Sequence, residues 1–479
     1  GSGSCVKPVC YDNTPCGAGR QCIDPGKYNA KCDPCPSGTQ CTCPSGQVAD
    51  GSGGCGVNSC DGYLTANGYG AAKDMASFKA ALGSGVSEIG ITASFTVNED
   101  VNLYGKKIYP ASKYTGSPKC SSTPKPTLEI TGHVALNNAL IDGVNLNITG
   151  GSYKDYLVSG NGTLKDMDLA TSYYAFMFNG NTVNLQGTIN LSGSGINLDN
   201  GSSLNIAGTL SIAGSENSAT IKLENSSKMT VASSGKFSYT GRAGTMGVVE
   251  AKTGSKAIFN GPLVIKPVTG TNYQPGVWSG LSGYSGGSFE LNANGNVIES
   301  YHSAIYMSSS DTYTTSLKIN GSTTLSMKNT GSTNGQHAIE AWGGNYGNKS
   351  KFTIDINAPL TVTGLYGYSG EYEISQADHL FYILDTTINV NSTVTTNTGI
   401  AKLLRNNLNM KAGGSIMGLS KYSNEGSGTT TYTSGTKLKI GGVCKKATKT
   451  ESKVGSSQKY YTINVTSSNS LGSPFTGGC

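Results

Sequence analysis

The segment Val183-Asn-Leu-Gln-Gly-Thr-Ile-Asn-Leu191 recurs 21 residues later as Leu204-Asn-Ile-Ala-Gly-Thr-Leu-Ser-Ile212. In both copies apolar residues alternate with polar ones, and a Gly-Thr pair separates two apolar-x-apolar triplets. Alternation with a period of two is typical of β-strands that bury one face. Similar units occur at 257–265 and 317–325. The repetition predicts a solenoid built from short strands.

The spacing of these units predicts the size of one coil. The strand that opens each unit begins near residues 174, 195, 219, 247, 276, 303, 338, 380 and 400, at intervals of 20 to 42 residues. A basal coil of about 20 residues with insertions at one turn fits every interval. Three short strands and three turns per coil predict an all-β, single-stranded parallel β-helix of roughly 12 coils.

In such a β-helix, apolar side chains stack inside, and Gly and Asn at the corners supply the turns with positive φ. A β-sandwich is the alternative for a glycine-rich all-β chain. It would not keep such similar coils in register over so long a stretch, so we expect the β-helix.

Composition limits the other possibilities for this chain of 479 residues. It contains 67 Gly without a Gly-X-Y period, which excludes collagen. Only 13% of its residues are charged, which argues against a disordered, highly charged chain. No apolar run reaches the roughly 18 to 20 residues of a membrane helix, so no transmembrane segment is predicted. The net charge of +6 is small for 479 residues and the chain contains only three Arg, which does not favour nucleic-acid binding.

An amphipathic helix is predicted at residues 71–82. Met75, Phe78 and Leu82 recur there at i, i+3 and i+7, and glycines follow at once. Short alternating strands are expected next, at 89–91, 95–97, 101–103 and 107–109. A helix ahead of such strands would cover the open end of the first coil.

The cysteines form a dense N-terminal group and three outliers. Ten lie before residue 61: Cys5, Cys10, Cys16, Cys22, Cys32, Cys35, Cys41, Cys43, Cys55 and Cys60. The others are Cys120, Cys444 and Cys479. The N-terminal group has no His and no second CxxC at zinc-ribbon spacing, so disulfides are favoured over a metal site.

Disulfides imply secretion or display on the cell surface, with any export signal removed or outside the given sequence. A Cys444–Cys479 bridge would tie a covering segment onto the last coil. Alternatively, Cys479 bridges to another subunit. The odd total of 13 leaves one thiol unpaired, available for an intermolecular bridge, or buried.

Part of the cysteine-rich segment resembles the second half of an EGF-like module. Cys35-x5-Cys41-Thr-Cys43-Pro-Ser-Gly46, followed by Cys55, contains the C-x-C-x-x-G core of such modules. The acidic entry sequence of calcium-binding EGF modules is missing. We therefore divide the chain into an EGF-like disulfide domain (1–60), a linker with the capping helix (61–90), the β-helix (91–443) and a Lys-rich C-terminal segment (444–479).

The run from Gly187 to Ile206 resembles passenger domains of bacterial autotransporters and related filamentous adhesins. The fold implied by this resemblance is the right-handed parallel β-helix, which pectate lyases share. Pectate lyases need calcium-binding Asp clusters and an Arg base. The Asn-Thr-Asp, Asp-Asp, Gly-His-Gly and Arg-Ile-Lys motifs of polygalacturonases are absent. No catalytic residue, metal site or cofactor is predicted from these motifs.

Histidines and aromatic residues offer two candidate sites. His337 and His379 fall at equivalent places on adjacent coils. Such a pair could bind a metal or shuttle a proton. The alternative is that both histidines cap backbone carbonyls in turns. With Val277, Ile305, Ile339 and Phe381 inside, the next residue on each coil points outward. These outward residues are Trp278, Tyr306, Glu340 and Tyr382. Together with Trp342, which is expected in a nearby turn, they are the candidate glycan-binding residues. The alternative is that these aromatic residues form a structural ladder.

Together these features predict a secreted or cell-surface adhesin or structural protein of the envelope. Its expected partners are host or environmental glycans or surface proteins, or further copies of itself in a filament. The alternative is a polysaccharide lyase or glycoside hydrolase that acts on an extracellular glycan.

Overall fold

The structure, a computed structural model, describes the chain in part. It covers 69–115, 120–149, 158–172, 176–193, 195–214, 220–241, 247–267, 279–309, 314–328, 336–343, 351–365, 378–425, 428–454, 475–476 and 478–479, with the backbone of four short strands before residue 58. The chain divides into two units, Gly1–Ala170 and Thr171–Cys479, each considered by itself.

The four short N-terminal strands form two antiparallel pairs. Strand β1 (Arg20–Ile23) pairs with β2 (Lys31–Pro34), and β3 (Gln47–Ala49) pairs with β4 (Cys55–Val57). The side chains of the ten N-terminal cysteines lie outside the described residues. The EGF-like domain and its disulfides therefore stay predictions.

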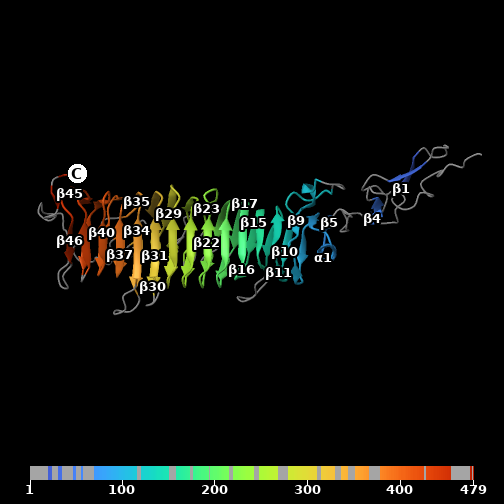
Figure 1. The fold of residues 1–479 in the computed structure, drawn as a ribbon, viewed down its shortest axis with the longest axis horizontal. Coiled ribbons are helices and arrows are strands. Elements are labelled where there is room, and N and C mark those ends of the chain that lie inside the picture. The colour runs from blue at the N-terminus through green and yellow to red at the C-terminus, as the bar shows by residue number, and fades with distance from the viewer. Residues whose placement is uncertain are drawn as a thin grey trace, which may run out of the picture. The chain divides into compact units, whose positions relative to one another are not determined.

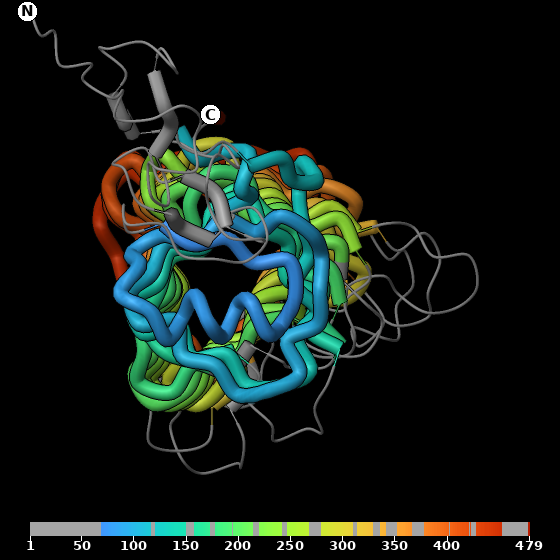
Figure 2. Tube along the Cα trace, turned by 90° about the vertical axis from the view of Figure 1, so that its right-hand side faces the viewer, coloured from blue at the N-terminus to red at the C-terminus, as the bar shows by residue number. Residues whose placement is uncertain are grey.

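The predicted helix is present but begins later than expected. Ala71 and Ala72 belong to strand β5 (Tyr69–Ala72), and helix α1 spans Met75–Gly83. Asp74 fixes its start, because its side chain accepts a hydrogen bond from the Ser77 backbone while the Ser77 hydroxyl bonds back to the Asp74 backbone. Helix α1 buries Phe78 against Phe95, with ring centroids 5.6 Å apart. In Figure 2 it lies across the opening of the first coil.

The first unit consists of three stacks of parallel strands. One contains β6 (Glu88–Ile91), β9 (Lys107–Pro110), β12 (Ala139–Asp142) and β15 (Gly162–Thr171). The second contains β7 (Phe95–Val97), β10 (Thr127–Ile130) and β13 (Asn145–Ile148), and the third β8 (Val101–Asn102), β11 (Val134–Ala135) and β14 (Val158–Ser159). A 3-10 turn, η2, spans Ala111–Lys113. The four strands predicted at 89–109 are confirmed, with β8 one residue shorter.

The second unit also consists of three parallel stacks, called here the first, second and third faces (Figure 1). The first face contains β16 (Phe176–Asn179), β18 (Ile196–Asp199), β21 (Ile221–Leu223), β24 (Val249–Lys252), β27 (Ser279–Tyr284), β30 (Ser303–Ser309), β33 (His337–Gly343), β36 (His379–Leu384), β39 (Ile400–Leu404) and β42 (Lys421–Glu425). The first nine of these strands begin within three residues of the nine predicted starts, and β42 follows them.

Strand β17 (Thr182–Gly193) runs through both of the other faces. The second face continues with β19 (Ser203–Ile206), β22 (Lys228–Val231), β25 (Lys256–Phe259), β28 (Ser288–Leu291), β31 (Thr314–Ile319), β34 (Lys351–Ile356), β37 (Thr386–Val390), β40 (Asn407–Met410) and β43 (Thr429–Tyr432). The third continues with β20 (Thr209–Gly214), β23 (Lys236–Tyr239), β26 (Leu263–Ile265), β29 (Asn296–Ser300), β32 (Thr323–Met327), β35 (Leu360–Thr363), β38 (Thr393–Thr396), β41 (Ser415–Leu419) and β44 (Lys437–Ile440).

The core of the second unit is a set of apolar columns that run from coil to coil. In β31, Leu317 and Ile319 are fully buried, whereas Lys318 between them is exposed. Leu317 lies in register with Phe289 on one neighbouring strand and Ile354 on the other. The parallel register and the alternating burial confirm a β-solenoid of stacked parallel sheets.

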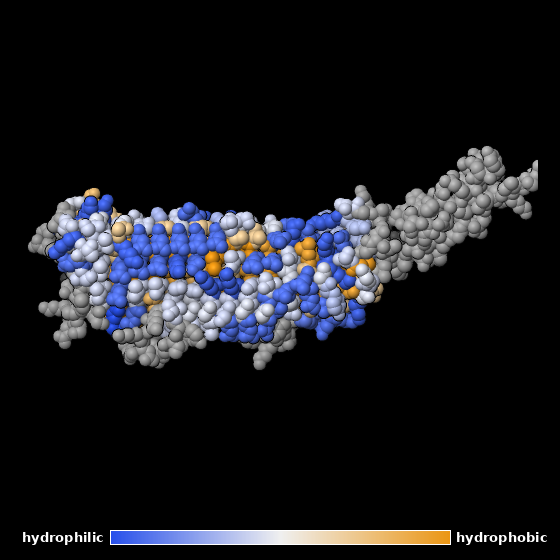
Figure 3. Space-filling view, in the orientation of Figure 1, coloured by the Kyte–Doolittle hydropathy of each residue, from blue (hydrophilic) through white to orange (hydrophobic). Residues whose placement is uncertain are grey.

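An asparagine ladder runs along the outside of the same unit. After the first member, the side-chain amide of each Asn donates to the side-chain oxygen of the Asn one coil earlier, at 2.5 to 2.8 Å. Its members are Asn260, Asn292, Asn320, Asn357 and Asn391. Figure 3 shows hydrophilic residues in regular rows across β31, β34, β37 and β40. The ladder joins side-chain amides at the same corner of five successive coils.

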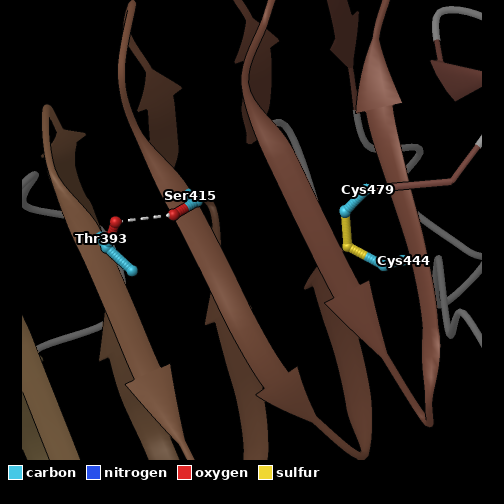
Figure 4. Close-up of a disulfide and its surroundings, with 4 residues drawn as sticks. All are labelled: Thr393, Ser415, Cys444 and Cys479. Atoms are coloured by element: carbon cyan, nitrogen blue, oxygen red, sulfur yellow. Dashed lines mark hydrogen bonds between the residues drawn. A yellow bond between two sulfur atoms is a disulfide. The ribbon is translucent and has the colours of Figure 1, made fainter.

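The C-terminal end of the second unit departs from the parallel pattern. Strand β45 (Val443–Ala447) pairs antiparallel with β44, β46 (Glu451–Val454) with β43, and β47 (Phe475–Thr476) with β45. The predicted Cys444–Cys479 disulfide is present, next to the coils that the Thr393–Ser415 hydrogen bond links (Figure 4). These antiparallel strands cover the edges of the last coil on two faces.

Candidate functional site

The predicted outward column lies on the first face of the second unit. Ile305, Ile339 and Phe381 are in register and fully buried. The following residues, Tyr306, Glu340 and Tyr382, are therefore also in register, as the sequence predicts.

The prediction was wrong about which residue of the preceding coil joins this column. Leu281, not Val277, pairs with Ile305, so Ser282 aligns with Tyr306. The segment 277–281 offers two apolar residues four positions apart, and alternation alone does not choose between them. Trp278 lies outside the described residues. The prediction that Trp342 lies in a turn was also wrong: it belongs to β33, where it pairs with Ser308, and its side chain lies outside the described residues.

A local irregularity brings histidines to the side of this column. Ala338 and Ile339 are consecutive and both fully buried, and the same holds for Leu380 and Phe381. Two buried residues in a row break the alternation, as at a β-bulge, and the register shifts between His379 and Phe381. As a result, His337 lies on the same side of its strand as Glu340.

The histidines form a cluster of ring contacts with one tyrosine. The ring centroids of His302 and His337 are 5.5 Å apart, and those of His337 and His379 are 5.0 Å apart. Tyr382 stacks on His337 at 4.7 Å with an interplanar angle of 15°. The predicted equivalence of His337 and His379 is confirmed by their direct pairing, and His302 joins them from the preceding coil.

Glu340 lies beside His302 at one end of this cluster. Its carboxylate accepts a hydrogen bond from the Ser303 hydroxyl and lies 3.8 Å from His302 Nδ1. His302 Nδ1 is also within hydrogen-bond distance of that hydroxyl, at 2.9 Å. Only 7% of Glu340 is exposed, so its charge faces protein groups more than solvent. We call His302, Ser303, His337, Glu340, His379 and Tyr382 the histidine–tyrosine cluster.

Burial sets the protonation behaviour at the edge of the cluster. It lowers the pKa of His302, which favours the neutral imidazole. It also raises the pKa of Tyr306, and the negative charge of Glu340 raises it further. Both groups are therefore neutral at neutral pH and able to serve as hydrogen-bond donors or acceptors.

A second charged group lies further along the same face. Glu250 is almost fully buried and forms an ion pair with Lys252 at 2.6 Å. Burial raises the pKa of Glu250, and Lys252 opposes that shift. The Lys252 ammonium also lies 5.3 Å from the centroid of Tyr284, whose ring is 5.6 Å from that of Tyr306. A continuous polar and aromatic strip thus runs from β24 to β36.

Sequence reasoning missed His302 and Ser303. A signal for Ser303 was present, because Ser303, His337 and His379 each directly precede a pair of small or apolar residues: Ala304-Ile305, Ala338-Ile339 and Leu380-Phe381. Among the described residues, no three His, Cys, Asp or Glu side chains are arranged to hold a metal ion. The contacts that define the cluster are hydrogen bonds, the approach of His302 to Glu340, and ring contacts.

No family model, no curated protein and no solved structure matches this chain. No helix in the described part of the chain is long and apolar enough to cross a membrane.

Proposed function

We propose that this chain is a secreted or cell-surface β-helical protein that serves as an adhesin or structural element and binds a glycan along its first face. The observation that carries the proposal is the alignment of Tyr306, Glu340 and Tyr382 on three adjacent strands. Tyr306 and Tyr382 are two coils apart, about 10 Å along the axis, a distance comparable to the length of a disaccharide.

Tyrosine suits a sugar ligand because its ring stacks on the apolar face of a pyranose while its hydroxyl forms hydrogen bonds. Tyr306 and Tyr382 are both only partly buried. Glu340, in contrast, is buried by its neighbours. We therefore propose that the tyrosines contact the glycan, and that Glu340 holds Ser303 and His302 in place.

Disulfide chemistry supports the extracellular location in this proposal. Cys444 is bonded to Cys479, and Cys120 is also disulfide-bonded. Such bonds persist in oxidising surroundings such as the periplasm, the cell surface or the medium. The resemblance to autotransporter passengers and filamentous adhesins points to the same compartment, and display on a bacterial envelope is part of the proposal.

An enzyme acting on an extracellular glycan is the second candidate. It is favoured by the 3.8 Å approach of His302 Nδ1 to the Glu340 carboxylate, since such a pair can exchange a proton. Glycoside hydrolysis commonly uses two carboxylates about 5 to 10 Å apart. The other buried carboxylate of this strip, Glu250, lies three strands from Glu340 and pairs with Lys252.

The two candidates differ in turnover. The whole chain is incubated with a panel of neutral and uronic-acid glycans while binding, new reducing ends and unsaturated products are measured. Binding without products is expected. Products that disappear in the His302→Gln variant would replace the binding proposal with the enzymatic one.

A further inference from the structure

The C-terminal part of the chain carries all of its net positive charge. Residues 386–479 contain ten lysines and one arginine but only two glutamates and no aspartate, a formal charge of +9. The whole chain has +6, so residues 1–385 sum to −3. The excess is a local feature of the C-terminal coils and not a property of the whole protein.

Four of these lysines lie on the hairpin formed by β44 and β45: Lys445 is opposite the buried Leu438, and the other three are Lys437, Lys439 and Lys446. Lys437 and Lys446 are exposed and lie directly opposite each other in the antiparallel register. Lys439 is two residues from Lys437, opposite Cys444. Leu438 and Ile440 alternate with these lysines and are buried, so Lys437 and Lys439 point away from the core. We call Lys437, Lys439 and Lys446 the lysine patch.

Several lysines in other strands of the chain have acidic partners. Lys107 pairs with Glu88 at 3.3 Å, and Lys165 with Asp142 at 3.0 Å. Lys256 pairs with Glu290 at 2.7 Å. No described carboxylate forms an ion pair with a lysine of the patch. Two like charges directly opposite in an antiparallel pair are destabilising, and an anion placed between them would remove that cost.

The hairpin is held in a fixed geometry. Its turn consists of Gly441 and Gly442, both at positive φ, as a two-residue hairpin turn requires. The disulfide from Cys444 to Cys479 ties β45 to the chain end. The charges of Lys437 and Lys446 are therefore presented from a preorganised surface.

We propose that the lysine patch binds a linear anionic glycan, and that the regularly spaced carboxylate or sulfate groups of the glycan contact the lysines. Nucleic acid is less suited, since the described strands β44, β45 and β46 contain neither arginine nor an aromatic residue that could stack on bases. A lipid surface would need more apolar area than the tip offers, where Val443 is 40% exposed. This charged site is separate from the tyrosine contacts proposed on the first face.

The test measures binding of the whole chain to three immobilised polymers: heparin-type sulfated chains, a polyuronate and neutral dextran. Binding to one or both charged polymers that weakens with added salt is expected, and the stronger arm identifies sulfate or carboxylate as the ligand group. The double variant Lys437→Gln with Lys446→Gln should bind about tenfold more weakly. The pair Lys437→Arg with Lys446→Arg should retain binding.

Lys228→Gln with Lys256→Gln is the matched control, because these lysines are also in direct register, on β22 and β25. It should leave the affinity unchanged. Equal binding to dextran, equal losses in the control, or an unchanged affinity in the patch variant would overturn the proposal. So would tighter binding to single-stranded DNA or anionic vesicles. Thermal unfolding of the patch variant should not occur at a lower temperature, which separates lost binding from lost folding.

Discussion

The imidazole of His337 lies flat against the phenol ring of Tyr382, with centroids 4.7 Å and planes 15° apart. His337 comes from β33 and Tyr382 from β36, so this contact joins two adjacent coils on the outside of the first face. It links the histidines of the histidine–tyrosine cluster to the column of Tyr306, Glu340 and Tyr382. The two candidate sites in the sequence therefore form one surface.

Replacing Tyr382 tests the energetic role of this stack. Tyr382→Ala removes ring contacts with His337 and His379 and should lower the free energy of unfolding by about 1 to 3 kcal/mol. Tyr382→Phe keeps the ring and should stay within about 0.5 kcal/mol of the original chain. Chemical denaturation followed by circular dichroism measures both. Equal losses in the two variants would show that the hydroxyl, not the stacked ring, matters.

Acidification should weaken the fold through His302. Burial lowers the pKa of this residue in the folded chain, whereas the unfolded chain takes up its proton near pH 6.5. Below about pH 6.5 the unfolded state thus binds more protons, and stability falls until the lower folded pKa is reached. In His302→Gln the loss of unfolding free energy between about pH 7 and 5.5 should be smaller than in the original chain.

The opposite sign would contradict this account of His302. The Glu340 carboxylate, 3.8 Å from His302 Nδ1, favours the protonated imidazole. If that attraction outweighed burial, the original chain would gain stability on acidification relative to His302→Gln.

The sequence predicted the coils well and the site partially. Starts of the first-face strands were predictable because inward residues such as Ile305 and Ile339 keep one register through insertions of different length. The start of α1 was missed because Ala71 and Ala72 fit a helix and a strand equally, and the Asp74–Ser77 capping box decides between them. The position of His337 on the same side of its strand as Glu340 could not be predicted, because it depends on the irregularity before Ile339, which strict alternation does not anticipate.

The asparagine ladder should contribute to stability in proportion to the bonds each member forms. Asn320 both donates to Asn292 and accepts from Asn357, whereas Asn260 in the ladder only accepts, from Asn292. Asn320→Ala should cost about 1 to 2 kcal/mol and Asn260→Ala about half of that. Denaturant titrations of the two variants make the comparison. A larger loss for Asn260→Ala would exclude an additive ladder.

A glycine at a coil corner tests how closely successive coils approach. A Cβ on Gly261 would lie 2.0 Å from the carbonyl oxygen of Gly235, one coil earlier. Gly261→Ala should therefore destabilise the second unit by more than about 2 kcal/mol, because backbone must move. Gly83→Ala at the end of α1 meets nothing within 4 Å and serves as the control. If Gly261→Ala unfolded at the same temperature as the original chain, that result would contradict this close packing of the coils.

The central claim is that Tyr306 and Tyr382 bind a glycan. The most direct test titrates one glycan from the panel into the original chain and into the double variant Tyr306→Ala with Tyr382→Ala. Isothermal titration calorimetry of the whole chain gives the affinity, and Asn320→Ala, altered in the ladder instead of the column, is the control. Loss of two stacking contacts predicts an affinity at least about tenfold weaker in the double variant and unchanged in the control. Undiminished binding by a folded double variant would contradict the claim.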